Sequence, residues 1–296
     1  MSKPLVSIFM PTYNAERYVE EALDSALNQD YSNIEVVISD DASTDATPQI
    51  LKRYQEKYPE KIKLFLQEKN LGVTKNCNFI LKKCVGDYIC FFAGDDVLQS
   101  NCISEKYALS LEHDSAIIFH RQILIDESGA VLGESSRHSS HKGSLRDFLK
   151  KGVYVRASGM LINKKTIPDD GFDECQPVAS DVDFILRVLN IKNCFYYTNQ
   201  ELSKYRKHGL SVTATEHLNC RLDNLKAYLN VMVNYPSHAR YVKGAISRRY
   251  FSMRHLTLGD MNYLNWLFNS ISYDFSNYKS WVGLVVYLIT FRRISL

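Results

Sequence analysis

The chain has 296 residues, of which 45% are hydrophobic and 23% charged, so it can bury a full core and is not intrinsically disordered. A formal net charge of +3 is too small to indicate a nucleic-acid partner, and 13 Gly with 7 Pro exclude collagen-like or low-complexity sequence. Seven cysteines, without a CxxC pair or a Cys/His ligand spacing, are typical of a reducing compartment, so we expect a cytoplasmic protein. The apolar run at residues 5–10 ends at Pro11 and is too short for a signal peptide.

The first hundred residues alternate between the hydrophobic periods of strands and helices. Asn14 is the expected N-cap of the first helix. Short apolar runs separated by amphipathic segments are typical of βαβ crossovers, which predicts an α/β fold with a mostly parallel sheet flanked by helices. The predicted elements are strands at 5–10, 34–39, 62–66 and 88–92 and helices at 15–29, 45–58 and 73–84.

The alternation of strands and helices becomes less regular after residue 100. A polar stretch at 128–144, rich in Gly, Ser and His, is expected to be a long mobile loop. Residues beyond about 213 have helical periodicity, which predicts a first domain of residues 1–213 and a helical C-terminal region of residues 214–296. The other predicted elements are helices at 101–112 and 182–189 and strands at 116–120, 159–163 and 194–198.

Polar clusters follow each of the first four predicted strands. They are Thr12-Tyr13-Asn14, Asp40-Asp41, residues 67–72 and Gly94-Asp95-Asp96. Because parallel strands end at one edge of a sheet and ligands bind outside that edge, we expect these clusters to form one site.

Adjacent carboxylates at Asp95 and Asp96 repel each other unless a cation compensates them, and carboxylate oxygens with substrate phosphates suit Mg²⁺ or Mn²⁺. The alternative is a turn in which Asp caps the helix that begins near residue 100. Asp41 offers an acceptor for a nucleobase N–H or a ribose hydroxyl, or else helps to cap the helix at 45–58. Asp181 is either the start of a helix or a general base.

The segment from Tyr205 to Ser211 contains three cationic or titratable side chains. Arg206 and Lys207 are suited to neutralising a diphosphate, and His208 to ligating a metal or donating to a phosphate, although most single histidines do neither. The sequence has no GxGxxG, GxxxxGK[ST], HExxH or GxSxG motif. Dinucleotide redox chemistry, P-loop phosphotransfer and zinc proteolysis therefore lack their characteristic residues.

The end of the chain is basic and apolar. Residues 236–296 hold eight Lys or Arg against two Asp, a net charge of +6. The apolar run at 281–291 is too short to cross a bilayer, and Lys279 and Arg292-Arg293 flank it. Such a segment suits an anionic membrane surface, with a buried helix or a homodimer contact as the alternatives.

Six segments in order resemble glycosyltransferase family 2, the inverting nucleotide-sugar transferases with the GT-A fold. This resemblance covers residues 5–213 and implies that Asp41 contacts the nucleotide base, that Asp95 and Asp96 bind a divalent cation (Mg²⁺ or Mn²⁺) and the diphosphate, and that Asp181 is the catalytic base. The expected donor-binding residues are Pro11, Thr12, Tyr13, Asn14, Asp41, Asn70, Lys75, Asp95 and Arg206, with His208 as a further metal ligand. The segments are VSIFMPTYN (6–14), VVISDDASTDAT (36–47), NLGVTKNCN (70–78), GDYICFFAGDD (86–96), SDVDFILRVL (180–189) and YRKHGLSVT (205–213).

Two positions depart from the family pattern. Ala93 stands where a third acid is common, which leaves fewer carboxylates for the metal, and Ser180 stands where a Glu commonly precedes the base. The implied reaction moves a sugar from a nucleotide-diphospho-sugar, expected to be UDP- or dTDP-linked, to a hydroxyl of a glycan or lipid-linked acceptor. Enzymes that build O-antigen or capsule do this at the inner face of the membrane, which implies a peripheral location.

Two other functions are compatible with this reading. A sugar nucleotidyltransferase usually has an early Gly-rich phosphate loop, but residues 10–20 contain no Gly. An inactive carbohydrate-binding scaffold at the membrane would not need Asp181, so one point variant separates it from an enzyme.

Overall fold

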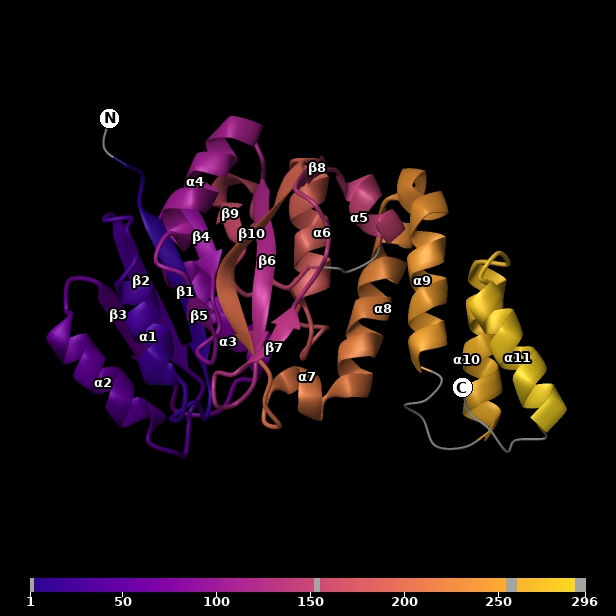
Figure 1. The fold of residues 1–296 in the computed structure, drawn as a ribbon, viewed down its shortest axis with the longest axis horizontal. Coiled ribbons are helices and arrows are strands. Elements are labelled where there is room, and N and C mark those ends of the chain that lie inside the picture. The colour runs from indigo at the N-terminus through magenta and orange to yellow at the C-terminus, as the bar shows by residue number, and fades with distance from the viewer. Residues whose placement is uncertain (1–2, 152–154, 254–259, 291–296) are drawn as a thin grey trace.

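The computed structural model describes residues 3–151, 155–253 and 260–290 (Figure 1). The N-terminal half is a parallel sheet built from alternating strands and helices, as the sequence predicts. Strands β1, β2, β3 and β4 lie in the order β3-β2-β1-β4, and Thr12 of β1 pairs with Asp40 of β2, which pairs with Leu66 of β3. The elements are β1 (Val6–Thr12), α1 (Val19–Leu27), β2 (Ile34–Asp40), α2 (Thr47–Lys57), β3 (Ile62–Leu66), α3 (Val73–Lys83) and β4 (Tyr88–Phe91).

Later strands extend the same sheet beyond β4, in the order β9-β6-β10-β5. β6 and β10 are parallel, but β9 is antiparallel to both β4 and β6, so the α/β sheet is mixed in this half. The further elements are β5 (Val97–Leu98), α4 (Cys102–His113), β6 (Ile117–Ile125), β7 (Val131–Glu134), β8 (His141–Gly143), α5 (Leu145–Lys151), β9 (Leu161–Asn163), α6 (Asp181–Ile191) and β10 (Phe195–Arg206).

Three local predictions are wrong. Asn14 does not cap α1, which begins at Val19; its backbone is left-handed (φ 46°) and its Oδ1 accepts from the Thr44 N–H. The stretch at 128–144 is not one long loop, because β7 pairs with β6 and β8 pairs with β10. β10 runs to Arg206, well past the predicted end at residue 198, because its polar second half pairs with β6.

The hydrophobic core lies on both faces of the sheet. One buried cluster joins β1, β2 and β4 to α1 and α4, and the other joins the opposite face to α3 and α6. Helices α8 and α9 belong to the second cluster, because Tyr228 and Ile246 are buried in it with Phe184 of α6. A small third cluster joins α10 and α11 through Leu267 and Leu284. The C-terminal helices are α7 (Val212–Thr215), α8 (His217–Asn234), α9 (Ala239–Met253), α10 (Asp260–Tyr273) and α11 (Tyr278–Thr290).

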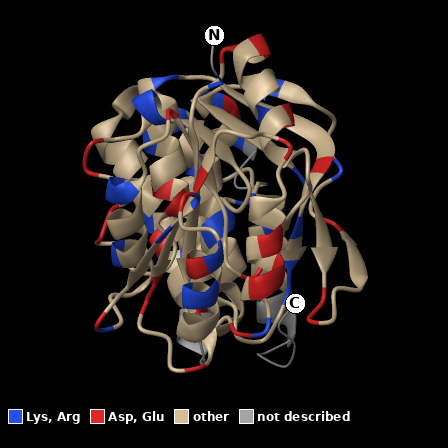
Figure 2. Ribbon diagram, turned by 90° about the vertical axis from the view of Figure 1, so that its left-hand side faces the viewer, with Lys and Arg blue, Asp and Glu red and all other residues tan. Residues whose placement is uncertain are grey.

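The C-terminal helices extend sideways from the sheet in a row, with α8 beside it and α11 farthest away (Figure 1). The predicted domain boundary at residue 213 stays a prediction. Within the described part of the chain, none of the helices combines the length and the apolar character needed to span a membrane. At the opposite end of the molecule, where α2 and β3 lie, acidic and basic residues are interspersed (Figure 2).

Candidate active site

Three turns meet at the carboxyl edge of the parallel strands, which is the lower edge of the sheet in Figure 1. Thr12 ends β1, and its hydroxyl donates to Asp40 Oδ1 at 3.1 Å while its carbonyl accepts from the Asp41 N–H at 2.9 Å. A Cβ at Gly94 would lie 2.7 Å from Thr12 Cγ2, so the turn after β4 packs against the same residue. The structure therefore brings together the polar clusters that follow β1, β2 and β4.

Asp41 holds the turn after β3 to the end of β2. Its buried carboxylate accepts from the backbone N–H groups of Leu71 (2.7 Å) and Gly72 (3.0 Å). Burial raises the pKa of Asp41, although these two hydrogen bonds act in the opposite direction. Each carboxylate oxygen can accept a second hydrogen bond, so this arrangement leaves acceptor capacity for a nucleobase or ribose.

Asp95 and Asp96 have different surroundings. Asp95 Oδ2 lies 2.9 Å from His208 Nε2, and Asp96 Oδ1 accepts from the Arg206 N–H at 2.8 Å. Asp96 is buried, and its Oδ2 has no hydrogen-bond partner among the described residues. Burial raises the pKa of Asp96 well above its usual range, and the neighbouring charge of Asp95 adds to the rise. A cation beside Oδ2 would relieve both effects.

A divalent cation fits this pair only with help from a ligand. Among the residues that the structure describes, no group of three or more His, Cys, Asp or Glu is placed to hold a metal. Mg²⁺ is ordinarily held by one or two carboxylates together with substrate phosphates, which matches what Asp95 and Asp96 offer. His208 Nδ1 is also buried without a partner in the described part of the chain, so it remains a candidate ligand.

The guanidinium of Arg206 binds other groups of the protein. Its Nε donates to the Asp95 carbonyl at 3.0 Å, and Nη1 lies 3.3 Å from the Asp126 carbonyl. Nη2 forms an ion pair with Glu21, and the guanidinium lies 4.8 Å from the centre of the Tyr18 ring. The side chain is only 2% exposed. These contacts favour a role in holding the turn at Asp95 rather than in contacting a donor.

Asp181 is the first residue of α6, and α3 helps to place it. Thr74 of α3 donates to the Gln176 carbonyl at 2.6 Å and lies 3.1 Å from the Ser180 hydroxyl. Burial, with smaller contributions from the carboxylates of Asp181 and Asp41, raises the pKa of the Cys77 thiol of α3 to about 12. The geometry thus links Asp181 to the carboxyl edge through the start of α3.

The surroundings of Asp181 favour its protonated form. The residue keeps some exposure to solvent, yet burial of the carboxyl raises its pKa, with a smaller opposing effect from the Val182 N–H and from Arg249 of α9. A raised pKa makes the carboxylate a stronger base, which suits proton abstraction near neutral pH.

The other predicted donor-binding residues lie around the same turns. Tyr13 is 52% exposed at the end of β1, beside Pro11, and Asn14 joins this turn to the one after β2 through Thr44. Asn70 Oδ1 accepts from the Gly72 N–H, and Lys75 is exposed on α3. Their contact with a donor stays a prediction.

A family model described as glycosyl transferase family 2 matches residues 7–168. The chain belongs to glycosyltransferase family 2. This glycosyltransferase is 38% identical to an uncharacterized glycosyltransferase of Haemophilus influenzae over 217 residues, which are 73% of this chain and 84% of that protein. It is 28% identical over 216 residues to the putative teichuronic acid biosynthesis glycosyltransferase TuaG of Bacillus subtilis, covering 72% and 83% of the two chains.

Solved structures confirm the GT-A fold of the glycosyltransferase. S. aureus TarS in complex with UDP-GlcNAc matches with a TM-score of 0.71 at 21% identity, over 92% of this chain and 81% of that one. The mannosyltransferase PcManGT from Pyrobaculum calidifontis, in complex with GDP-Man and Mn²⁺, matches with a TM-score of 0.56 at 15% identity, over 98% and 86%. The family membership sets aside the nucleotidyltransferase and the inactive scaffold, since this chain is an enzyme of glycosyl transfer.

Two arginines near the carboxylates of this glycosyltransferase were missed by the sequence reasoning. Arg156, in the segment between α5 and β9, stacks on Tyr205 of β10, with its guanidinium carbon 4.3 Å from the ring centre. Arg249 of α9 acts on Asp181 from a helix that the sequence assigns to a separate region. Neither lies in one of the six recognisable segments, so only the folded chain identifies them.

Proposed function

We propose that this glycosyltransferase moves a sugar from a UDP- or dTDP-linked donor to a hydroxyl of a glycan or lipid-linked acceptor, with inversion at the anomeric carbon. The observation that supports the proposal is that the turns carrying Asp41 and Asp95-Asp96 both contact Thr12, while Ser180, before the start of α6, contacts Thr74 of α3. TarS was solved with UDP-GlcNAc, and the name of TuaG refers to teichuronic acid biosynthesis, which supports a role in bacterial surface polysaccharide synthesis.

Asp181 is the proposed catalytic base. Its carboxylate takes the proton from the acceptor hydroxyl while that oxygen bonds to the anomeric carbon, and the nucleoside diphosphate leaves with the electrons of the broken bond. Because the attack comes from the side opposite the leaving group, an α-linked donor gives a β-linked product. The raised pKa of Asp181 predicts that transfer becomes faster as the pH rises through that pKa.

Asp95 and Asp96 are the proposed ligands of a Mg²⁺ or Mn²⁺ ion, with His208 as a candidate third. A divalent cation would supply positive charge to the diphosphate as it leaves. His208 holds Asp95 through Nε2, and the backbone N–H of Arg206 holds Asp96 through Oδ1. The first contact orients the Asp95 carboxylate and the second orients Asp96, whose Oδ2 has no partner among the described residues.

The C-terminal helices are proposed to bring the enzyme to the inner face of the cell membrane. Phe268, Phe275, Val282 and Val285 of this region are about half exposed or more, and Lys279 is exposed beside them. Apolar and cationic side chains together favour an anionic lipid surface. Arg292 and Arg293 lie outside the described residues. Flotation with anionic liposomes tests this: protein that stays at the bottom of the gradient is not a membrane binder and leaves a homodimer contact as the alternative.

Donor specificity is tested by thermal shift with a panel of UDP-, dTDP- and GDP-sugars in the presence of Mn²⁺. A true donor binds only the folded state and therefore raises the melting temperature by mass action. We expect a UDP- or dTDP-sugar to do so, and NMR of the product to show an inverted anomeric centre. A panel in which no sugar nucleotide shifts the melting temperature, or a product with a retained anomeric configuration, contradicts the proposal.

A further inference from the structure

Two arginines lie beside the Asp95-Asp96 pair, and they differ in how many of their guanidinium N–H donors are already used by the protein. The guanidinium of Arg206 donates to the carbonyls of Asp95 and Asp126 and pairs with Glu21. Arg156 forms no ion pair with the described residues, and its Nε is buried without a hydrogen-bond partner among them. A guanidinium has five N–H donors, so Arg156 retains donors that Arg206 has already used.

Arg156 lies over an aromatic ring, although its Nε has no hydrogen-bond partner among the described residues. Its guanidinium lies over the Tyr205 ring at 4.3 Å, and the Tyr205 hydroxyl is 3.4 Å from the Thr213 hydroxyl. Attraction between the cation and the ring holds the guanidinium in place without using any of its N–H donors. A buried donor without a partner is costly, which is why such a group commonly marks a place where a ligand binds.

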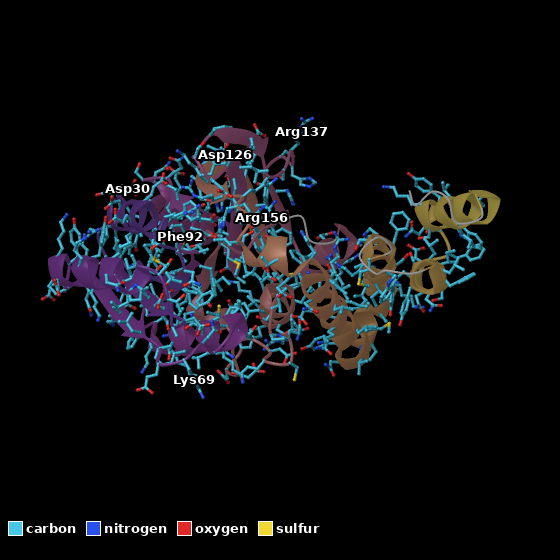
Figure 3. All side chains as sticks on the ribbon, turned by 90° about the horizontal axis from the view of Figure 1, so that it is seen from below. Asp30, Lys69, Phe92, Asp126, Arg137 and Arg156 are labelled. Atoms are coloured by element: carbon cyan, nitrogen blue, oxygen red, sulfur yellow. The ribbon has the colours of Figure 1, made fainter. Side chains whose placement is uncertain are left out.

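The segment that carries Arg156 is attached to the end of β4. The Gly159 N–H donates to the Phe91 carbonyl, and the Ser158 hydroxyl accepts from the Ala93 N–H at 3.4 Å. Ala93 directly precedes Gly94-Asp95-Asp96, so these contacts place Arg156 next to the carboxylate pair. The positive charge of Arg156 acts to lower the pKa of Asp96, against the larger effects of burial and of Asp95. Figure 3, seen from below, labels Arg156 near the middle of the molecule.

We propose that Arg156 binds the phosphate oxygens of the donor's diphosphate, through N–H groups oriented by Tyr205. This assignment rests on the proposed function, because it needs a nucleoside-diphosphate donor at Asp95 and Asp96. A planar guanidinium matches two phosphate oxygens at once. A diphosphate beside two carboxylates adds negative charge to an already acidic site, and Arg156 is the nearby cation whose donors are open to offset it.

The test compares UDP and uridine binding to the full chain, by calorimetry for UDP and by ligand-observed NMR titration for uridine. The variants are Arg156→Gln, Arg156→Lys and the control Arg137→Gln. Arg137 is exposed and projects from the molecule in Figure 3. If the wild-type protein prefers dTDP, the pair is dTDP and thymidine. Circular dichroism of each variant establishes that it is folded.

We expect Arg156→Gln to weaken UDP binding roughly 10- to 100-fold, the range for losing hydrogen bonds between charged partners. Arg156→Lys keeps the charge but loses the planar fork, so its loss should be smaller. Uridine binding should be unchanged in both variants, and Arg137→Gln should match the wild type throughout. The increase in UDP affinity on adding Mn²⁺ should survive in Arg156→Gln, because Asp95 and Asp96 are untouched.

Three results would overturn the assignment. UDP affinity in folded Arg156→Gln equal to the wild type would show that the guanidinium does not touch the diphosphate. A loss shared equally by uridine, or a lost response to Mn²⁺, would show that the substitution disturbs the site as a whole. A wild-type protein that binds none of UDP, dTDP and GDP refutes the proposed function itself, and the assignment of Arg156 with it.

Discussion

Replacing Arg206 by Met should destabilise the fold, because the structure uses this guanidinium as an internal connector. The side chain is 2% exposed and joins the Asp95 carbonyl (3.0 Å) and the Asp126 carbonyl (3.3 Å). The Asp95 carbonyl would lose its charged donor, which costs about 1–3 kcal/mol, whereas the Asp126 carbonyl would still accept from the Gly129 N–H. The ion pair with Glu21 adds less than about 1 kcal/mol, because the Glu21 side chain is 55% exposed. Together these give an expected loss of about 1–4 kcal/mol in the free energy of unfolding.

Urea unfolding followed by circular dichroism measures this loss. Lys207→Met is the matched control, since Lys207 is the next residue and is exposed; it should stay within about 0.5 kcal/mol of the wild type. Glu21→Gln should lose less than about 1 kcal/mol. A loss below about 1 kcal/mol in Arg206→Met would refute the reasoning from these hydrogen bonds. It would also favour the sequence prediction that Arg206 binds the donor.

Three further predictions concern the carboxylates. Asp181→Asn should abolish transfer, while its affinity for UDP stays near that of the wild type. The transfer rate of the wild type should rise as the pH rises through the raised pKa of Asp181. Unchanged turnover in the variant would remove Asp181 from the mechanism. Asp96→Asn should reduce the gain in UDP affinity on adding Mn²⁺ in calorimetry, and a wild type without any such gain would count against the metal site. Burial alone would raise the pKa of Glu35, but hydrogen bonds from Lys63 and Ser7 help to lower it, so its ionised form stabilises the fold at neutral pH. The wild type should therefore have a higher free energy of unfolding than Glu35→Gln at neutral pH. This difference should shrink as the pH falls below 4.5, the ordinary pKa of Glu, and on through the lowered pKa of Glu35. A difference that is the same at every pH would contradict this.

The parallel half of the sheet follows from the sequence because each of its strands is a short apolar run. Such runs are typical of strands buried on both faces, as β1 and β2 are, and β1, β2, β3 and β4 all lie where the apolar runs predict them. The position of the polar turns follows as well, because parallel strands end at one edge. This is why Thr12, Asp41 and Gly94 were expected together and are found together.

The second half of the sheet was less predictable, because strand pairing and not local composition determines where its strands begin and end. Residues 199–206 are largely polar, and they extend β10 only because β6 lies alongside them. β7 (Val131–Glu134) and β8 (His141–Gly143) likewise form within a Gly-, Ser- and His-rich stretch because they pair with β6 and β10. Tertiary context overrides local propensity in strands of this kind.

The roles of the arginines could not be read from the sequence at all. Arg206 stands in a recognisable segment, yet its donors are used by Asp95, Asp126 and Glu21, which are distant along the chain. Arg156 stands in no such segment, yet its buried Nε has no partner among the residues described. Whether a guanidinium is free depends on long-range contacts that only the folded chain defines.

A crystal structure of the full chain with UDP and Mn²⁺ tests the central claim most directly. The account predicts the nucleotide along the carboxyl edge of β1, β2 and β4, with Mn²⁺ between Asp96 Oδ2 and the diphosphate and with Asp181 facing the position of the sugar. Nucleotide bound at another face of the molecule, or a diphosphate out of reach of Asp95 and Asp96, would contradict it.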